Sequence, residues 1–489
     1  MLFRSQVKNH QVMRVVPLEN EDVNECWIAD RDRFSYEALN GDERLTSPML
    51  KQGGEWKTVD WQTALEYVAN GLKQIKADHG ANSIGTLASP HSTLEELYLA
   101  ASLMRGLGSD NIDYRLRNAE FTTPSAIRWL GTSIASLSQL QRVLVVGSNL
   151  RKDHPLFAQR IRQAVRKGGA LSAINSTTEL AHADAWAMPV ANTLLAAPEA
   201  WAQSLADVAA AIAADKGVTA PAAGQATDAA KAIAKSLQGG ERKAILLGNA
   251  AAHHANASSL LALANWIGAQ TGATVGYLTE AANTVGAQLA GALPAGKGLN
   301  AGQMLDGQLK AVILLNNEPE FDSALGARAK SSLNAAQMVV TLSPFKANMG
   351  FSDVLLPIAP FTETPGTFVN AEGRVQGFHA VVKPLGDTRP AWKVLRVLAN
   401  LLDLPGFDFE SSQDVLKQVA GAEAAQLPAD KLGNATQAGI QLSAAHTQAP
   451  AVASIYQLDG LVRRATSLQL TADARQAAGL DAKLEGVAA

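Results

Sequence analysis

Four short runs of continuously apolar residues constrain the fold of this chain most strongly. They read RVLVVGSN at 142–149, KAILLGN at 243–249, KAVILLN at 310–316 and MVVTLS at 338–343, and each ends in Gly, Asn or Ser. Continuous rather than alternating apolar character indicates strands that are covered on both faces, as in parallel sheets flanked by helices. Helical patterns lie between the runs. The sequence therefore predicts an α/β protein with doubly wound parallel sheets in several subdomains.

The length of 489 residues exceeds what a single hydrophobic core usually serves, so roughly two to four packed subdomains are expected. The apolar spacing of 61–76 predicts an amphipathic helix that Asp60 caps. We expect a small β-containing entry module at 1–45, an α/β subdomain from 46–125 and 240–375, an inserted Rossmann-like subdomain at 126–239 and a C-terminal region at 376–489. Within that last region, the weak periodicity of 423–450 predicts a loosely packed connection to a terminal element.

Charge and hydropathy exclude several functions. The net charge is −3, and the basic residues are scattered rather than gathered in a stripe, so no nucleic-acid partner is expected. No secretory signal opens the chain, and no run of about 18 apolar residues could cross a bilayer. Any membrane association is expected to come through partner proteins. The strand-like sequence at 11–16 predicts that residues preceding Met1 are missing or belong to another chain.

Cys26 is the single cysteine. One thiol excludes a disulfide framework and a cysteine-only zinc or iron–sulfur site, which suits a reducing compartment. We interpret Cys26 as a small, partly buried residue. The neighbouring His253 and His254 suggest a metal site, but adjacent side chains point to different sides of a helix or strand. Ordinary helix or loop histidines are the simpler interpretation, and no metal site is predicted.

The loop Gly147-Ser148-Asn149 follows a predicted strand and is the candidate cofactor-binding site. Backbone N–H groups and helix ends converge at the carboxyl edge of such sheets, so a nucleotide phosphate or guanosine could dock there. Alternatively, Gly and Asn simply turn the chain. Asp153 and His154 are interpreted as a helix-start cluster. The P-loop-like GALPAGK at 291–297 is followed by Gly298 instead of Ser or Thr and predicts an ordinary loop. No catalytic residue is predicted.

Several segments carry a family resemblance. They are VNECWIADRDRFSYEA at 23–38, VLVVGSNLRKDHPLFAQRIR at 143–162, DVLLPIAPFTETPGTFVNAEGRVQ at 353–376 and RPAWKVLRVLANLL at 389–402. Together they resemble the molybdopterin-oxidoreductase-like region of the large iron–sulfur subunit of respiratory complex I.

The resemblance implies a subunit or fragment of a proton-translocating NADH:quinone oxidoreductase. Its implied partners are the other peripheral-arm subunits, namely the NADH-binding flavoprotein and iron–sulfur subunits, on the cytoplasmic side of the bacterial inner membrane. The full-length family subunit binds [2Fe-2S] and [4Fe-4S] clusters in an N-terminal part that is absent here. Some members have a further cluster cysteine where this chain has Ala29, and Cys26 is out of register. No cofactor is therefore expected in this chain, which would act as a redox-silent scaffold with a relic nucleotide loop at 147–149.

The segment 351–376 resembles a loop that closes the cofactor cleft of molybdopterin enzymes. Without cluster cysteines, we predict that it stabilises the fold by pairing strands, with Glu372 and Arg374 as surface or interface charges that contribute little individually. Two alternatives remain open. One is a catalytic molybdopterin-dependent oxidoreductase of the formate or nitrate type, and the other is a stand-alone nucleotide-binding protein.

Overall fold

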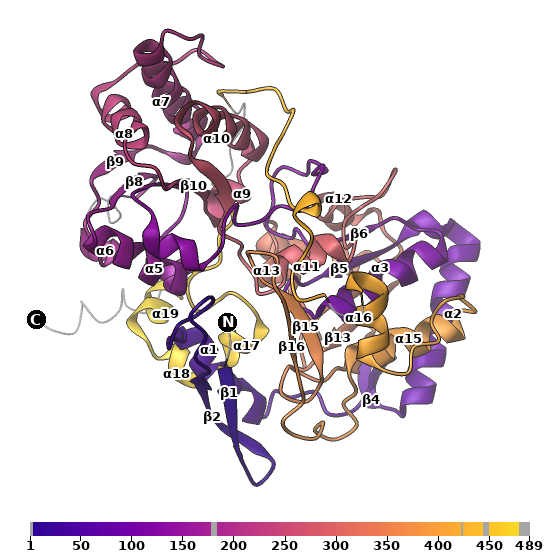
Figure 1. Cartoon of the computed structure of the whole chain (residues 1–489). Coiled ribbons are helices and arrows are strands. Elements are labelled where there is room, and N and C mark those ends of the chain that lie inside the picture. Colours follow the sequence, from indigo (N-terminus) through magenta and orange to yellow (C-terminus); the bar gives the residue numbers. More distant parts are fainter. Residues whose placement is uncertain (1–2, 178–182, 422–423, 444–448, 479–489) are drawn as a thin grey trace, which may run out of the picture.

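Two α/β units and a small N-terminal hairpin make up the protein (Figure 1). The computed structural model describes residues 3–177, 183–421, 424–443 and 449–478. The hairpin pairs β1 (Phe3–Lys8) with antiparallel β2 (Gln11–Pro17). Short helix α1 (Asp30–Phe34) follows it. In the described part of the chain, no helix is both long and apolar enough to span a bilayer.

The first unit contains a seven-stranded sheet in the order β4-β3-β14-β13-β12-β5-β6. Its parallel strands are β5 (Ile84–Ala88), β6 (Ile112–Asp113), β12 (Ala311–Leu315), β13 (Met338–Ser343) and β14 (Val354–Pro357), and the antiparallel edge is β3 (Met49–Gln52) with β4 (Glu55–Thr58). Its core includes residues of α2 (Trp61–His79), α3 (Leu94–Leu107) and α15 (Ala391–Leu401). Helix α2 begins as predicted, because the Asp60 side chain accepts a hydrogen bond from the Thr63 N–H.

The second unit contains a five-stranded parallel sheet in the order β11-β10-β7-β8-β9. Its strands are β7 (Arg142–Val146), β8 (Ala170–Asn175), β9 (Asn192–Leu195), β10 (Lys243–Leu247) and β11 (Thr274–Tyr277), and its main helices are α5 (Pro155–Arg166), α7 (Trp201–Lys216), α8 (Asp228–Gln238) and α10 (Ala257–Thr271). All four predicted apolar runs are strands in parallel pairs. The predicted α/β class with parallel sheets is confirmed.

The strand pairing differs from the expected boundary at residue 240. Strand β10 pairs in register with β7, Ile245 opposite Leu144, and β11 lies beyond β10. The second unit therefore extends through β11, and the chain re-enters the first sheet at β12. A strand that is apolar on both faces carries no local signal for its neighbour, so the sequence could not assign β10 to one sheet or the other.

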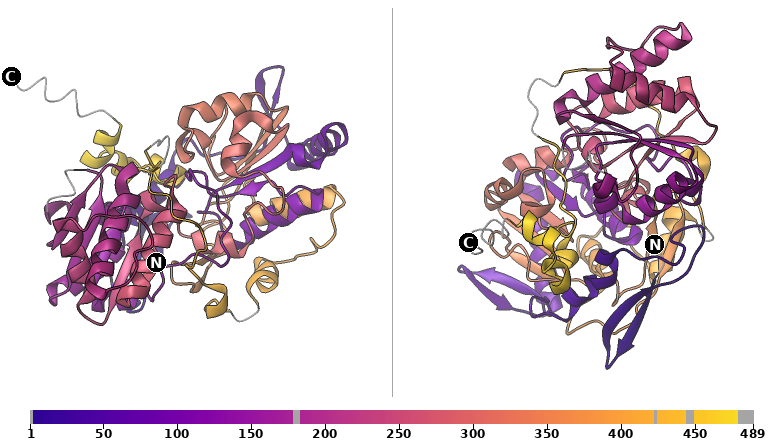
Figure 2. Two further views of the ribbon diagram at one scale, coloured as in Figure 1. Left: turned by 90° about the horizontal axis from the view of Figure 1, so that it is seen from above. Right: turned by 90° about the vertical axis from the view of Figure 1, so that its left-hand side faces the viewer.

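The C-terminal helices α17 (Gly460–Arg464), α18 (Thr466–Gln469) and α19 (Ala472–Ala477) return to the N-terminal module (Figure 2). The Ser467 N–H and hydroxyl both donate to Glu37, at 2.7 and 2.6 Å. The two ends of the described chain are thereby joined at one side of the molecule.

The hairpin formed by β15 (Gly366–Val369) and β16 (Val375–Phe378) places Glu372 at its tip. Glu372 is predicted to be a surface or interface charge, and the surface alternative is wrong, because Glu372 is 4% exposed and accepts from the Ile134 N–H at 2.7 Å and from Arg374 Nε at 2.9 Å. Gly373, with φ of 86°, turns the tip onto the second unit rather than into solvent. Arg374 is partly exposed and also reaches Asp22 at 3.3 Å.

Two adjacent glutamates of α3, Glu95 and Glu96, lie in the interior. Glu96 forms a capping box with Thr93: its carboxylate accepts from the Thr93 N–H at 2.9 Å. Burial raises the pKa of Glu96 from 4.5 to about 7. The folded state therefore keeps a proton that the unfolded state loses at lower pH.

This linkage predicts how stability depends on pH. The contribution of Glu96 to the free energy of unfolding is fully present below pH 4.5. As the pH rises toward 7, the protein loses about 1 to 3 kcal/mol of this stability. Glu96→Gln should therefore gain stability relative to the parent protein between pH 5 and pH 8, as measured by chemical unfolding at both values. Glu66→Gln, on the exposed face of α2, is the matched control. Parallel pH profiles for Glu96→Gln and the parent would contradict the expectation.

Candidate functional site

A cleft lies where the carboxyl ends of strands from both sheets meet. The loops after β5 and β6 contribute Pro90 and Tyr114, and the segments after β10 and β11 contribute Asn249 and Glu280. These and neighbouring residues line a cavity of about 140 Å³. Ligands of open α/β sheets bind at such strand ends, so this cleft is the candidate site.

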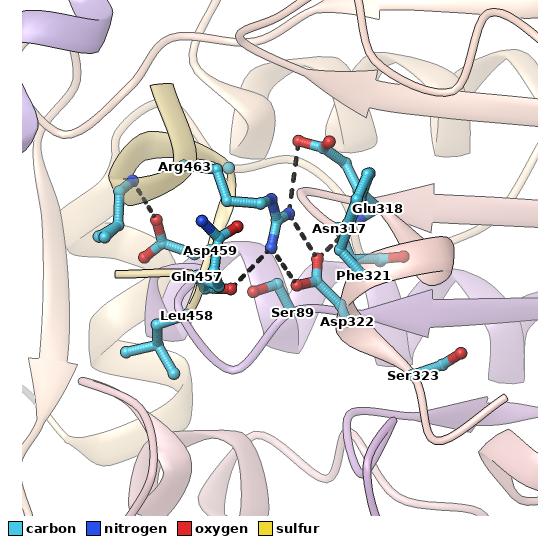
Figure 3. Close-up of polar contacts among 12 residues, drawn as sticks. Ser89, Asn317, Glu318, Phe321, Asp322, Ser323, Gln457, Leu458, Asp459 and Arg463 are labelled. Carbon is cyan, nitrogen blue, oxygen red and sulfur yellow. Dashed lines mark hydrogen bonds and ion pairs between the residues drawn. The ribbon is translucent and has the colours of Figure 1, made fainter. Parts of the chain in front are cut away.

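Beside this cavity, Arg463 binds the C-terminal segment to the residues that follow β12 (Figure 3). The Arg463 guanidinium donates to both carboxylate oxygens of Asp322, at 2.8 and 3.3 Å, and lies 3.5 Å from Glu318. Asp322 ends α13 (Pro319–Asp322), directly after β12. Burial alone would lower the pKa of Arg463, but the Asp322 and Glu318 carboxylates raise it above its ordinary value. Arg463 therefore stays charged.

Arg117 connects the two units to the same segment. Its guanidinium donates to Glu280 at 2.7 Å, to Asp322 at 3.0 Å and to the Leu458 carbonyl at 3.2 Å. Glu280 also lies 3.4 Å from His253 Nε2. Burial would raise the pKa of Glu280, but Arg117 and His253 hold it below its usual range.

The next residue of α17 extends the network. Arg464 Nη1 donates to Glu318 at 2.6 Å, and Arg464 also pairs with Glu43. His91, after β5, lies 3.7 Å from Asp459, the N-cap residue of α17. The carboxylates of Glu280, Glu318 and Asp322 are thus paired with arginines of the same chain. The network suits a structural link to the C-terminal segment better than general acid–base catalysis, which uses groups free to exchange protons.

The predicted loop Gly147-Ser148-Asn149 lies at the carboxyl end of β7, as expected. Ser148 is buried; its N–H donates to Asn175 and its hydroxyl to Asp153. Gly147 has φ of 63°, and an added Cβ would lie 2.7 Å from the Ala251 nitrogen. The loop is thus tied closely to its own protein, and binding of a nucleotide there stays a prediction.

The neighbouring histidines have separate partners. His253 Nδ1 lies 2.7 Å from the Ala451 carbonyl oxygen, whereas His254 Nε2 lies 2.9 Å from that of Pro198. Among the described residues, no group of three or more His, Cys, Asp or Glu side chains could hold a metal ion. Asp153 closes the loop after β7 by accepting from the Asn149 N–H at 2.9 Å.

Sequence reasoning missed the residues of the ion-pair network beside the cleft. Arg117, Asp322 and Arg463 come from three distant parts of the chain, and none belongs to a motif. The one local signal is the pair Arg463-Arg464 in a tail otherwise poor in charge. Such a pair does not identify its partners, because ion pairs between distant segments depend on the tertiary fold.

Comparison with known proteins identifies the family. A molybdopterin oxidoreductase family model matches residues 44–401, and the 4Fe-4S domain model of the NADH-ubiquinone oxidoreductase NDSU1/NuoG-like type matches residues 3–37. The chain therefore belongs to the molybdopterin oxidoreductase family. Acetylene hydratase from Pelobacter acetylenicus has the same fold, with a TM-score of 0.63 at 14% sequence identity over 85% of this chain and 69% of that chain.

Curated relatives have several different activities. The alpha subunit of an NADPH-Fe(3+) oxidoreductase of Geobacter sulfurreducens is 28% identical over 81% of this chain and 53% of its own length. The 75 kDa subunit of NADH-ubiquinone oxidoreductase of Reclinomonas americana is 24% identical, over 83% and 56%. A putative formate dehydrogenase of Staphylococcus haemolyticus is 24% identical, over 86% and 49%. The chain spans about half the length of these relatives.

The residues matched by the 4Fe-4S model do not fit a cluster held by cysteines of this chain. Cys26 is exposed, so the prediction that it is partly buried is wrong. It follows a tight turn at Asn20–Glu25 that directs it outward. Buried Ala29 directly precedes α1. The Asn24 amide instead ties this region together, donating to the carbonyls of Leu18, Glu25 and Trp27 at 3.0 to 3.3 Å.

The cleft does not fit a molybdopterin dinucleotide in its present form either. Pockets for ligands of drug size usually have roughly 300 to 1,000 Å³, against about 140 Å³ here. The C-terminal segment does not line this cavity but lies beside it, where the Leu458 carbonyl accepts from Arg117 and Arg463 donates to Asp322, both of the first unit.

Proposed function

We propose that this chain is a redox-silent scaffold of the peripheral arm of a proton-translocating NADH:quinone oxidoreductase. The complex transfers electrons from NADH to quinone, and this region positions neighbouring subunits. Its partners are the NADH-binding flavoprotein and iron–sulfur subunits. It lies on the cytoplasmic side of the bacterial inner membrane and reaches the membrane only through those partners.

The observation that carries the proposal is the ion-pair network beside a cleft of only about 140 Å³. The segment after β12, at the strand ends where α/β proteins bind ligands, binds the chain's own α17 through Arg463 on Asp322 and Arg464 on Glu318. Buried ion pairs within one chain serve stability and positioning. The 24% identity to the 75 kDa subunit and the match to the complex I-type 4Fe-4S model support the choice of complex.

Metal analysis of the purified chain tests the proposal. We expect iron, acid-labile sulfide, molybdenum and tungsten well below stoichiometric amounts, and no activity with NADH. Co-expression with the flavoprotein and iron–sulfur subunits should yield a complex that contains this chain. Stoichiometric iron and sulfide in the isolated chain, or failure to join that complex, would contradict the scaffold role.

The rival function is a molybdopterin-dependent oxidoreductase of the formate or nitrate type. Similarity to a putative formate dehydrogenase favours it. The same samples decide between the two, because molybdenum or tungsten together with a guanine dinucleotide would favour the rival.

A further inference from the structure

Helices α2 and α15 lie in the first unit, away from the cleft (Figure 1). Residues of both helices line a groove. It has a volume of about 410 Å³, within the usual range of binding pockets. Trp61 and Leu65 of α2 form one wall, and Val394 and Val397 of α15 form the other. The groove thus offers an apolar floor that is large enough for one or two side chains.

Three cations surround this floor: Arg389, Lys393 and Arg396. In the described part of the chain, none of them forms an ion pair with a carboxylate. Arg389 lies over the Trp61 ring at 4.9 Å, and Lys393 lies over the Trp392 ring at 5.4 Å. Arg396 Nη1 donates to the Phe409 carbonyl at 2.7 Å, while its buried Nε has no partner there. The groove therefore has unused hydrogen-bond donors.

The charge balance of the groove is strongly positive. Glu410 is the one acidic side chain among its lining residues. Arg389 and Lys393 are exposed, and Arg396 is half-buried. The three cations leave a net positive charge at the groove, which an anionic ligand would complement.

We propose that this groove binds an acidic peptide segment of a partner protein. Carboxylates of the segment pair with Arg389, Lys393 and Arg396, and an apolar side chain packs between Leu65 and Val397. The volume of about 410 Å³ favours a peptide over a small inorganic anion, which would occupy only a fraction of the groove. Naming a protein as the ligand rests on the scaffold role proposed above.

Fluorescence anisotropy with the full chain tests this proposal. The probe is a short labelled peptide of repeating Glu-Leu-Glu units, and its counterpart has Gln in place of Glu. We expect the acidic probe to bind in a salt-dependent manner and the Gln probe to bind at least about tenfold more weakly. Lys393→Glu should weaken binding of the acidic probe by about tenfold, and Glu410→Gln should tighten it.

Two charge-reversal variants show whether binding depends on the charge at the groove or on the net charge of the whole protein. Lys393 is exposed in the first turn of α15, where an acidic residue suits the helix dipole, so Lys393→Glu should fold normally. Lys235→Glu makes the same charge change on α8 of the other unit and should leave binding unchanged. Equal binding by Lys393→Glu and the parent, absence of binding by the acidic probe, or full displacement of the probe by inorganic phosphate at equal ionic strength would overturn the proposal. The metal content of the purified chain tests the scaffold role independently of peptide binding. The scaffold proposal and the groove proposal can therefore be contradicted separately.

Discussion

Replacing Arg463 with alanine is expected to lower the free energy of unfolding by about 3 kcal/mol or more, because it removes one partner from a buried ion pair. The carboxylates of Asp322 and Glu318 would then have fewer donors. Chemical unfolding followed by circular dichroism measures the change. The partner Arg117 still binds Asp322, so the loss should stay near the low end of the range for buried pairs.

An exposed arginine provides the matched control. Arg328 lies on the surface near α13, and Arg328→Ala should change stability by about 0.5 kcal/mol or less. Arg463→Lys keeps the charge but loses the bidentate hydrogen bonding to Asp322, so we expect a loss of stability between those of the two alanine variants. If Arg463→Ala matches the Arg328→Ala control, the ion pairs of the cleft do not hold the C-terminal segment in place.

The second large effect concerns the pair of Arg44 and Glu363. Both side chains are nearly inaccessible, at 3% and 5% exposure, and their closest atoms are 2.8 Å apart. Arg44 also donates to the carbonyls of Pro344 and Leu39. Arg44→Ala should therefore lower the free energy of unfolding by about 3 to 5 kcal/mol, measured in the same way.

A surface ion pair with a similar N–O distance tests whether burial causes the large loss of stability. Lys73 and Asp403 lie 2.7 Å apart but are 47% and 83% exposed, so Lys73→Ala should cost about 1 kcal/mol or less. The double replacement Arg44→Met with Glu363→Leu should recover much of the loss, because no buried charge is then left alone. A double variant as unstable as Arg44→Ala would mean that the backbone contacts of Arg44 dominate.

Patterns within one element could be predicted from the sequence. The cap at Asp60 and the apolar run of β12 depend on residues that are close along the chain, and both occur where expected. Contacts between distant segments could not be predicted. Glu372 lies at a hairpin tip, where the sequence predicts an accessible charge. In the structure it is buried and accepts a hydrogen bond from the Ile134 N–H of the other unit. The same limit hid the cleft network, in which Asp322 and Arg463 are joined only by the complete fold.

Strand β5 pairs with β12 only after the entire second unit has been made, since β7 to β11 lie between them in the chain. Contacts between such distant segments are slow to form, whereas units with nearer partners fold earlier. During synthesis, the five-stranded unit can fold while β5 has β6 beside it but still lacks β12. The helix α17 leaves the ribosome later still, so its ion pairs with Asp322 and Glu318 are among the last contacts to form.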